Sequence, residues 1–363
     1  MAGLERVSFD GALGPVATLP DGRIVSLYTE NTDLFDFGRP RDESWAYTRY
    51  SRDGGRTWSE PTRAYAHAAG LGVEDSFLPL VDRDGRLHAF GTRYFGVGRD
   101  GFPPRSVVIH CRSDDGGATW TRIQPVDFGH DYTGWLNSAI QLASGRILLP
   151  LSYLDESRTR DRFVSLVCYS DDSGDTWRQS NDLHVASGSE YLESGAIEPV
   201  VVQLASGIVW LLLRTQTGYL WESFSSDGAD WTAPRGTRIV ASNAPAGVLR
   251  LRDDRIALVW NNVFGEPFRQ GASYARFQLH GAISDDDAQT WSRPKVIAER
   301  QSGEPTETHV RYPYLCQVPD GWIVTRYTRV RVWLDHREYQ TELVRLDPEW
   351  LASRTDTVRD KGE

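Results

Sequence analysis

Short apolar runs alternate with polar turn pairs along most of the chain, in a pattern that repeats six times. In each repeat an apolar run meets a turn pair, most often Asp-Gly or Ser-Gly, and a second apolar run follows. Runs rich in Val, Ile, Leu and aromatic residues, bounded by such turn pairs, indicate β-strands. The pattern therefore predicts six units that each open with a strand, a tight turn and a second strand. The paired runs are 14–19 with 24–28, 77–81 with 87–90, 139–142 with 147–151, 199–204 with 208–213, 247–251 with 256–260, and 314–318 with 322–327.

A Ser-X-Asp-X-Gly-X-Thr-Trp motif follows a predicted third strand in these units. Ser51–Trp58, Ser113–Trp120 and Ser170–Trp177 carry it in full; Ser225–Trp231 is one residue short, and Ser284–Trp291 has Ala where Gly stood. A fixed period of this length indicates stacked copies of one supersecondary unit. Asp bonds back to backbone N–H groups and Gly supplies a positive φ, so the motif predicts a turn between two outer strands.

The motif resembles the Asp box of the sialidase (neuraminidase) superfamily of BNR-repeat proteins. This resemblance implies an all-β fold: a six-bladed β-propeller of four-stranded antiparallel blades. The sixth unit reaches a third strand near 342–346 and then has no box and no fourth strand, while residues 4–9 have no partner of their own. We predict that the N-terminal segment supplies the missing outer strand and closes the ring, because closure removes exposed sheet edges.

Residues 1–353 are expected to form this single domain, with a short helix around 349–353 and a disordered tail over 354–363. The net charge of −10 argues against a nucleic-acid partner. The eight histidines show no metal-ligand spacing, so neither a metal nor a cofactor is expected. No signal peptide pattern or membrane-length apolar run is visible, which favours a cytoplasmic protein with no membrane partner. Cys111, Cys168 and Cys316 are expected to be buried free thiols in a reducing compartment.

In a four-stranded blade the Asp boxes lie at one end and the functional face lies at the other. Three equivalent positions per blade should therefore face a site: the start of strand one, the end of strand two and the start of strand three. All six ends of strand two are polar, including Arg214 and Asn261. The other two positions carry Glu198 and Tyr312 at the start of strand one, and Glu43, Arg105, Arg162 and Arg276 at the start of strand three.

These residues carry a second resemblance to the sialidases. Ala196-Ile-Glu-Pro-Val, with Arg214 sixteen residues after the Glu, resembles the family segment that carries a Glu and a carboxylate-binding Arg. The segments that begin at Arg276 and at Arg311 resemble those that carry another such Arg and the catalytic Tyr. The resemblance implies that Tyr312 is the nucleophile and Glu198 its base, that Glu43 or Asp42 is the acid, and that Arg214 and Arg276 bind the sugar. Further candidate contacts are Arg105, Arg162, Asp75, Asn261 and Arg311.

One position departs from the family pattern. The family's first carboxylate-binding Arg precedes a Pro at the start of blade one, whereas this chain has Gly11-Ala-Leu-Gly-Pro15 there. Arg105 or Arg162 could replace it from another blade.

The leading hypothesis is a metal-free, retaining exo-glycosidase of sialidase type that acts on a small glycan or glycoside. A second hypothesis is an exo-glycosidase of the same fold that uses two carboxylates on another sugar, such as arabinofuranose. A third is a polysaccharide lyase, and a fourth is a non-catalytic propeller that binds a glycan or a protein. The sugar, the linkage and the oligomeric state stay open at this level.

Overall fold

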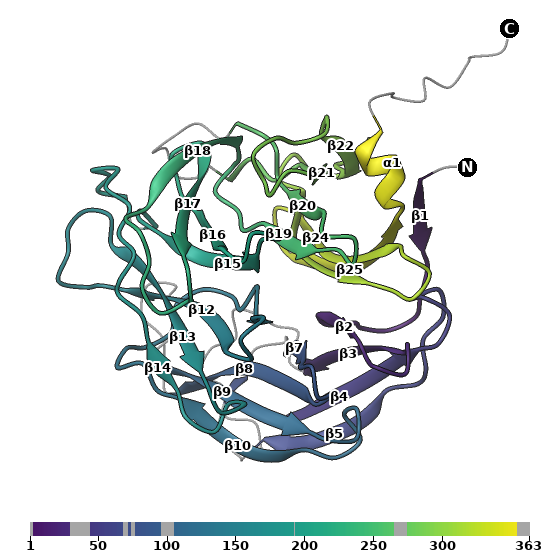
Figure 1. Ribbon diagram of the computed structural model, residues 1–363. Coiled ribbons are helices and arrows are strands. Elements are labelled where there is room, and N and C mark those ends of the chain that lie inside the picture. The colour runs from purple at the N-terminus through teal and green to yellow at the C-terminus, as the bar shows by residue number, and fades with distance from the viewer. Residues whose placement is uncertain are drawn as a thin grey trace, which may run out of the picture.

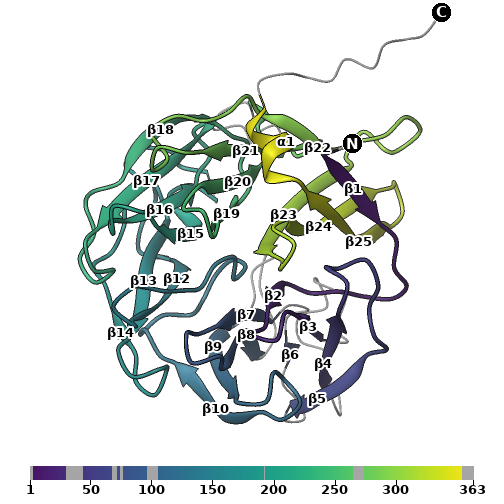
Figure 2. The ribbon, with the colours of Figure 1, turned by 45° about the vertical axis from the view of Figure 1, so that its right-hand side comes forward.

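Six antiparallel sheets surround a common centre, as Figures 1 and 2 both show. The structure is a computed structural model that describes residues 3–29, 44–67, 72–73, 77–95, 105–191, 193–264 and 274–353. The predicted all-β propeller of six blades is confirmed. The predicted tail over 354–363 lies outside the described residues.

Each blade is a meander whose first strand lies nearest the centre. Blade two departs from four strands because its inner strand is in two pieces, β6 and β7, which both pair with β8. Blade one contains β2 (Val16–Thr18), β3 (Ile24–Thr29), β4 (Ser44–Ser51) and β5 (Thr62–His67); blade two β6 (Gly72–Val73), β7 (Leu78–Val81), β8 (Leu87–Phe95), β9 (Arg105–Ser113) and β10 (Thr121–Val126); blade three β11 (Ile140–Gln141), β12 (Ile147–Leu154), β13 (Phe163–Ser170) and β14 (Arg178–Gln179). Blade four contains β15 (Ile197–Gln203), β16 (Val209–Arg214), β17 (Tyr219–Ser225) and β18 (Arg235–Val240); blade five β19 (Gly247–Arg250), β20 (Ile256–Trp260), β21 (Gln278–Ser284) and β22 (Lys295–Glu299); blade six β23 (His309–Gln317), β24 (Ile323–Val332), β25 (Arg337–Leu346) and β1 (Leu4–Val7).

The N-terminal strand closes the ring as predicted. β1 pairs antiparallel with β25, from Leu4 opposite Leu346 to Val7 opposite Leu343. The predicted helix is also present, as α1 (Pro348–Ala352). Its Leu351 is fully buried in an apolar cluster that joins blades five and six. The core thus lies in layers between neighbouring blades, and the last blade is completed by both ends of the chain.

The Asp boxes form the predicted turns between the third and fourth strands. In the first box, the Ser51 hydroxyl donates to Asp53 (2.8 Å) and accepts from the Gly55 N–H (2.8 Å), and Gly55 has a φ of 92°. In the fifth box Ala288 keeps a positive φ of 65°. Asp287 of that box accepts from backbone N–H groups in the first turn of blade four. The boxes and the first turns therefore share one end of the ring, which leaves the other end for a site.

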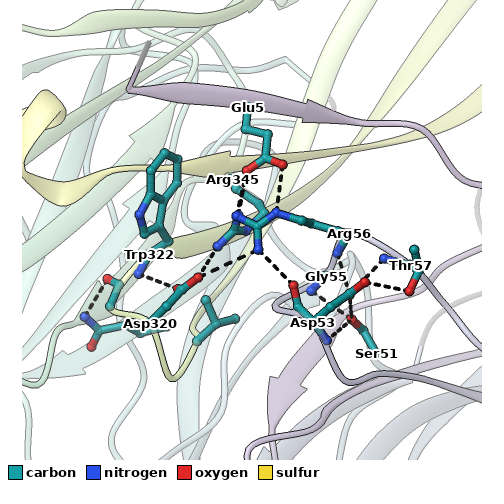
Figure 3. A network of polar contacts seen from close by, with 12 residues as sticks. Glu5, Ser51, Asp53, Gly55, Arg56, Thr57, Asp320, Trp322 and Arg345 are labelled. Carbon is teal, nitrogen blue, oxygen red and sulfur yellow. Dashed lines mark hydrogen bonds and ion pairs between the residues drawn. The ribbon is translucent and has the colours of Figure 1, made fainter. Parts of the chain in front are cut away.

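A buried arginine, Arg345, lies where the N-terminal strand closes the ring, as Figure 3 shows. The Arg345 side chain is fully buried; its guanidinium donates to Glu5 of β1 (2.5 Å) and to Asp320 in the first turn of blade six. It also lies 4.9 Å from the centre of the Trp322 ring. Arg56 of the first Asp box binds the same Glu5 at 2.9 Å. One cluster of charges therefore joins the N-terminal strand, blade six and blade one.

Replacing Arg345 with Gln should destabilise the closed ring. The change leaves Glu5 and Asp320 with only the partly exposed Arg56, 2.9 Å from Glu5 and 3.9 Å from Asp320, as a cation. Loss of one partner of a buried ion pair costs about 3–5 kcal/mol. Because both carboxylates are partly exposed, we expect the free energy of unfolding in urea to fall by about 2–4 kcal/mol. The control is Arg235→Gln, at an exposed pair with Glu222, where a loss below about 1 kcal/mol is expected. Equal losses of unfolding free energy in Arg345→Gln and Arg235→Gln would contradict the conclusion that the ion pairs of Arg345 stabilise the closed ring.

A second buried polar cluster lies inside blade two. His88 Nδ1 is 2.9 Å from His110 Nε2, and His88 Nε2 is 3.1 Å from an Asp82 carboxylate oxygen. Burial lowers the pKa of His110 to about 3, with a further contribution from the charge of His88. Burial also lowers the pKa of His88, against the opposing effect of Asp82. Both rings are therefore neutral in the folded protein at neutral pH.

The buried histidine cluster predicts that the free energy of unfolding falls as the pH falls. Since the folded pKa of His110 lies below its unfolded value, the unfolded chain binds the extra proton between about pH 6.5 and 3, and stability falls as the pH falls through that window. We expect His110→Phe, which keeps a ring between Phe90 and Trp177, to flatten the dependence of the unfolding free energy on pH by up to about 1.4 kcal/mol per pH unit. The control is His336→Gln, at an exposed hairpin residue. An unchanged slope in His110→Phe would refute the prediction.

Candidate active site

Two strained residues face each other from the inner strands of blades four and six. Glu198 in β15 and Tyr312 in β23 have φ values of 50° and 56°, and each lies where the pairing register of its strand shifts. Each is followed by a proline. Of the seven described non-glycine residues with positive φ, only these two lie within strands. A bulge re-aims a side chain, and strain of this kind collects at functional sites.

The two side chains are in direct contact. The Tyr312 hydroxyl donates to Glu198 Oε1 at 2.9 Å. The same oxygen accepts from the Trp135 N–H at 3.1 Å, and Arg214 donates to Oε2 at 2.5 Å. Gly134 makes room for this arrangement, because a Cβ there would lie 2.9 Å from Glu198 Cγ. The buried carboxylate therefore has three donors, of which one is a cation and one is the phenol.

The phenol is neutral in the resting site. Burial raises the pKa of Tyr312 to about 12, and the charge of Glu198 acts in the same direction. Arg214, Arg276 and Arg311 act in the opposite direction. A neutral phenol is a weak nucleophile unless a base removes its proton. Glu198 is within hydrogen-bond distance for that transfer.

Arg214 and Arg276 meet at one asparagine, Asn243, in the segment between blades four and five. Arg214 Nε donates to the Asn243 side-chain oxygen at 2.6 Å, and Arg276 Nε donates to its backbone carbonyl at 2.9 Å. Arg214 also donates to Glu193 at 3.0 Å. Burial lowers the pKa of Arg276 to about 9, and the neighbouring charge of Arg214 adds to this effect. Asn243 therefore sets the positions of two adjacent cations.

Aromatic rings and a third arginine complete the cluster. The Tyr274 ring centre is 4.7 Å from the Arg276 guanidinium carbon and 5.8 Å from that of Arg214. Arg276 and Arg311 lie 5.8 and 5.2 Å from the centre of the Tyr312 ring. Two cations thus lie beside the phenol ring, whose hydroxyl contacts the Glu198 carboxylate.

The remaining predicted residues differ in placement. Asn261 donates to backbone carbonyls of Gln278 and Val310, and so ties blade five to blade six. Arg105 is mostly exposed and lies 3.8 Å from Asp131. Neither Arg105 nor Arg162 has a hydrogen bond or ion pair with the described residues around Tyr312. The predicted acids Glu43 and Asp42, and Asp75, lie outside the described residues.

Four residues of the cluster are not among those that the sequence predicts for the site: Gly134, Glu193, Asn243 and Tyr274. Two signals could have found some of them. Asn243 lies two residues before Pro245, which is the blade-five counterpart of Glu198, and Tyr274 lies two residues before Arg276. In both cases the signal is nearness in sequence to a position that counting from the turns and boxes already marks.

The described residues contain no group of three or more His, Cys, Asp or Glu side chains that could hold a metal. All three cysteines are buried and free, as predicted. Among the described residues, no helix has the length and apolar character of a membrane span.

Comparison with known proteins agrees with this architecture. The sequence model of the BNR repeat-like domain family matches residues 77–325. The chain belongs to this family. A sialidase from Micromonospora viridifaciens is 27% identical over 339 residues, which cover 83% of this chain and 47% of that protein. A sialidase from Clostridium perfringens is 26% identical over 133 residues, which cover 33% of this chain and 32% of that protein. The BNR-repeat chain thus spans less than half the length of these curated relatives.

Solved structures of low sequence identity share the fold of this BNR-repeat chain. The leech intramolecular trans-sialidase, complexed with 2,7-anhydro-Neu5Ac, has a TM-score of 0.70 at 16% identity over 96% of this chain and 69% of that one. The NanB sialidase from Streptococcus pneumoniae has a TM-score of 0.67 at 15% identity, with 96% and 71% covered. A protein of unknown function from Dyadobacter fermentans has a TM-score of 0.69 at 20% identity, with 95% and 100% covered. The predicted resemblance to the sialidase superfamily is confirmed.

The contact between phenol and carboxylate predicts a measurable titration. Because the charge of Glu198 disfavours the phenolate, Glu198→Gln should lower the pKa of Tyr312 from about 12. The measurement is an alkaline ultraviolet titration of phenolate absorbance. Tyr312→Phe identifies which part of the signal of the 15 tyrosines belongs to Tyr312. A Tyr312 titration that stays in place or moves upward in Glu198→Gln would show that the two groups are not coupled as described.

Proposed function

We propose that this chain is a sialidase-like exo-glycoside hydrolase that removes a terminal acidic sugar with retention of configuration. The observation that carries the proposal is the buried contact of 2.9 Å between the Tyr312 hydroxyl and Glu198, among three guanidinium groups. Tyr-dependent sialidases are a recognised exception to the two-carboxylate scheme of most glycosidases.

The proposed reaction has two displacements. In the first, the Tyr312 oxygen attacks the anomeric carbon while Glu198 takes the phenol proton. The bond to the leaving oxygen breaks, and that oxygen takes a proton from an acid, the role that the resemblance assigns to Glu43 or Asp42. In the second, water attacks the anomeric carbon and gives its proton to the carboxylate that the acid became in the first step, the bond to Tyr312 breaks, and the phenolate recovers its proton from Glu198. Two inversions at one carbon give net retention.

The charges around the phenol support an acidic substrate. A carboxylate nucleophile would repel an anionic sugar, whereas a neutral phenol does not. Arg276 is buried and repelled by two neighbouring guanidinium groups, so a bound anion would stabilise its charged form. Arginine also binds carboxylates through two parallel hydrogen bonds. The names of the relatives agree with this choice, since both curated relatives are called sialidases.

Tyr312→Phe tests the proposal directly. Removal of the nucleophilic oxygen should lower kcat on an aryl sialoside by at least about 10³-fold, as when a nucleophile is lost from other covalent mechanisms. The first-formed anomer of the wild-type reaction, followed by nuclear magnetic resonance, should have the configuration of the substrate. The screen includes aryl arabinofuranosides and uronides, with Glu198→Gln as a second variant.

Each competing function gives a different result in this experiment. Near-normal turnover by Tyr312→Phe, with loss only in Glu198→Gln, would favour a two-carboxylate glycosidase over the proposal. An unsaturated product that absorbs in the ultraviolet would indicate a lyase. Binding without turnover of any glycoside would indicate a non-catalytic propeller.

A further inference from the structure

A groove separates blades four and five on the outer side of the ring. It has a volume of about 640 Å³ and is lined by β16, β17 and β18 on one side and by the fifth Asp box on the other. β17 and β18 are the outer strands of blade four, as Figures 1 and 2 show. We propose that this groove is a carbohydrate-binding site that takes an uncharged oligosaccharide. It contains none of the residues around Tyr312, so the inference does not depend on the proposed hydrolase activity.

Side chains close the equivalent gaps between blades two and three and between blades three and four. Gln124, four residues after the Trp of the second box, donates to a backbone carbonyl of the third box. Asn181, four residues after the Trp of the third box, donates to the Trp231 carbonyl at 3.2 Å and accepts from its N–H at 2.8 Å. The counterpart in blade four is Arg235, which donates to Glu222 of its own blade. All of the fifth box lies within the described residues, and Arg235 has no hydrogen bond to it, so this gap stays open.

Trp210 places a large aromatic side chain where the other blades have smaller ones. Three residues after the second turn residue, those blades have Val25, His88, Leu148, Ala257 and Val324. The Trp210 side chain is buried, and its Nε1 donates to Glu222 at 2.9 Å. Its ring centre lies 6.1 Å from that of Trp291, with 30° between the two planes. Two indole rings from different blades therefore lie together in the wall of the groove.

The indole N–H of Trp291 has no acceptor among the described residues. Trp58, Trp120 and Trp231 donate theirs to a backbone carbonyl of their own box, at 3.0, 3.1 and 3.0 Å. The Trp291 nitrogen is not among the enclosed atoms that lack a partner, so it reaches the protein surface. Indole N–H groups usually find a hydrogen-bond partner. The fifth box therefore offers the groove a donor that the protein itself does not use.

The charged groups that line the groove balance one another. Glu222 forms an ion pair with Arg235 at 2.9 Å. Asp287 accepts from two backbone N–H groups of blade four, and Arg238 is exposed on β18. Two carboxylates thus stand against two guanidinium groups, and this balance favours neither an anionic nor a cationic ligand.

The polar groups of the groove match the hydroxyl groups of a neutral sugar, which both donate and accept hydrogen bonds. The Glu222 carboxylate accepts, the Arg238 guanidinium and the Trp291 indole donate, and the Gln289 amide does both. The C–H faces of a sugar ring are apolar, and aromatic rings bury such surface. The volume also falls within the range of about 300–1,000 Å³ that small-molecule sites occupy. An uncharged oligosaccharide therefore fits both the aromatic and the polar parts of the groove.

The Trp291 indole is also the reporter for the test. In the ¹⁵N-labelled full chain each of the 13 tryptophans contributes one indole N–H resonance, and Trp291→Phe identifies that of Trp291. The probes are lactose, N-acetyllactosamine and cellotriose. We expect at least one of them to shift the Trp291 resonance in a saturable way that yields a Kd. Glu222→Gln should raise this Kd by about fivefold or more, because it removes a charged hydrogen-bond acceptor.

Arg235→Gln tests the origin of the groove. It introduces the residue type that closes the gap between blades two and three, so we expect the same rise in Kd. The matched control is Trp120→Phe, which makes the indole-to-phenyl change in a box whose N–H is already bonded internally, and its Kd should equal that of the wild type.

No saturable shift of the Trp291 resonance with any of the three sugars would overturn the inference. Unchanged affinity in Arg235→Gln would also overturn it, and because Arg235 is exposed, this variant remains informative even if Glu222→Gln fails to fold. Sugar binding at the groove in a protein that turns over no glycoside would leave the inference standing while the proposed hydrolase function fails. Turnover without sugar binding at the groove would do the reverse.

Discussion

The buried ion pair between Glu198 and Arg214 is the contact on which the site depends. Both side chains are almost fully enclosed, at 1% and 4% exposure, so neither charge could remain there without the other. A buried pair is weak evidence for added stability, since packed apolar groups often do as well. Its value here is positional. It fixes the carboxylate at hydrogen-bond distance from the phenol, 2.9 Å from the Tyr312 hydroxyl oxygen.

Ring closure brings the two halves of the site together. Glu198 and Tyr312 are 114 residues apart in sequence, and they meet because blades four and six both direct the start of their inner strand to the centre. Blade six is complete only when β1 pairs with β25. The charges around Arg345 therefore stabilise the blade that carries Tyr312, although they lie at the opposite end, beside the first Asp box.

The sequence predicted the parts of the site that repeat, and it missed the parts that do not. Glu198, Tyr312 and Arg214 stand at equivalent places in repeated units, so counting from each turn located them. Glu193 and Asn243 lie in connections between blades, whose lengths vary, and no period reaches them. The bulges were also hidden, because a positive φ at a Glu or a Tyr leaves no signature in composition. Arg105 and Arg276 each lie eight residues before the first Ser of an Asp box. Only Arg276 contacts the cluster among the described residues, because this spacing fixes where along the blade a side chain begins and not which residue it contacts.

The two bulges explain how the inner strands of two different blades bring Glu198 and Tyr312 into contact. A regular inner strand would alternate its side chains between the two faces of the blade, and neither Glu198 nor Tyr312 would need to face the other. The register shift at each residue turns its side chain out of that alternation. The proline that follows each residue has no N–H to leave unpaired at the irregular position.

Each strained residue costs about 1–3 kcal/mol, and the surrounding contacts must hold it. For Glu198 these are Arg214, Trp135 and the space at Gly134; for Tyr312 they are Glu198 and the two flanking arginines. The groups that we propose to react are therefore the same groups that keep one another in place.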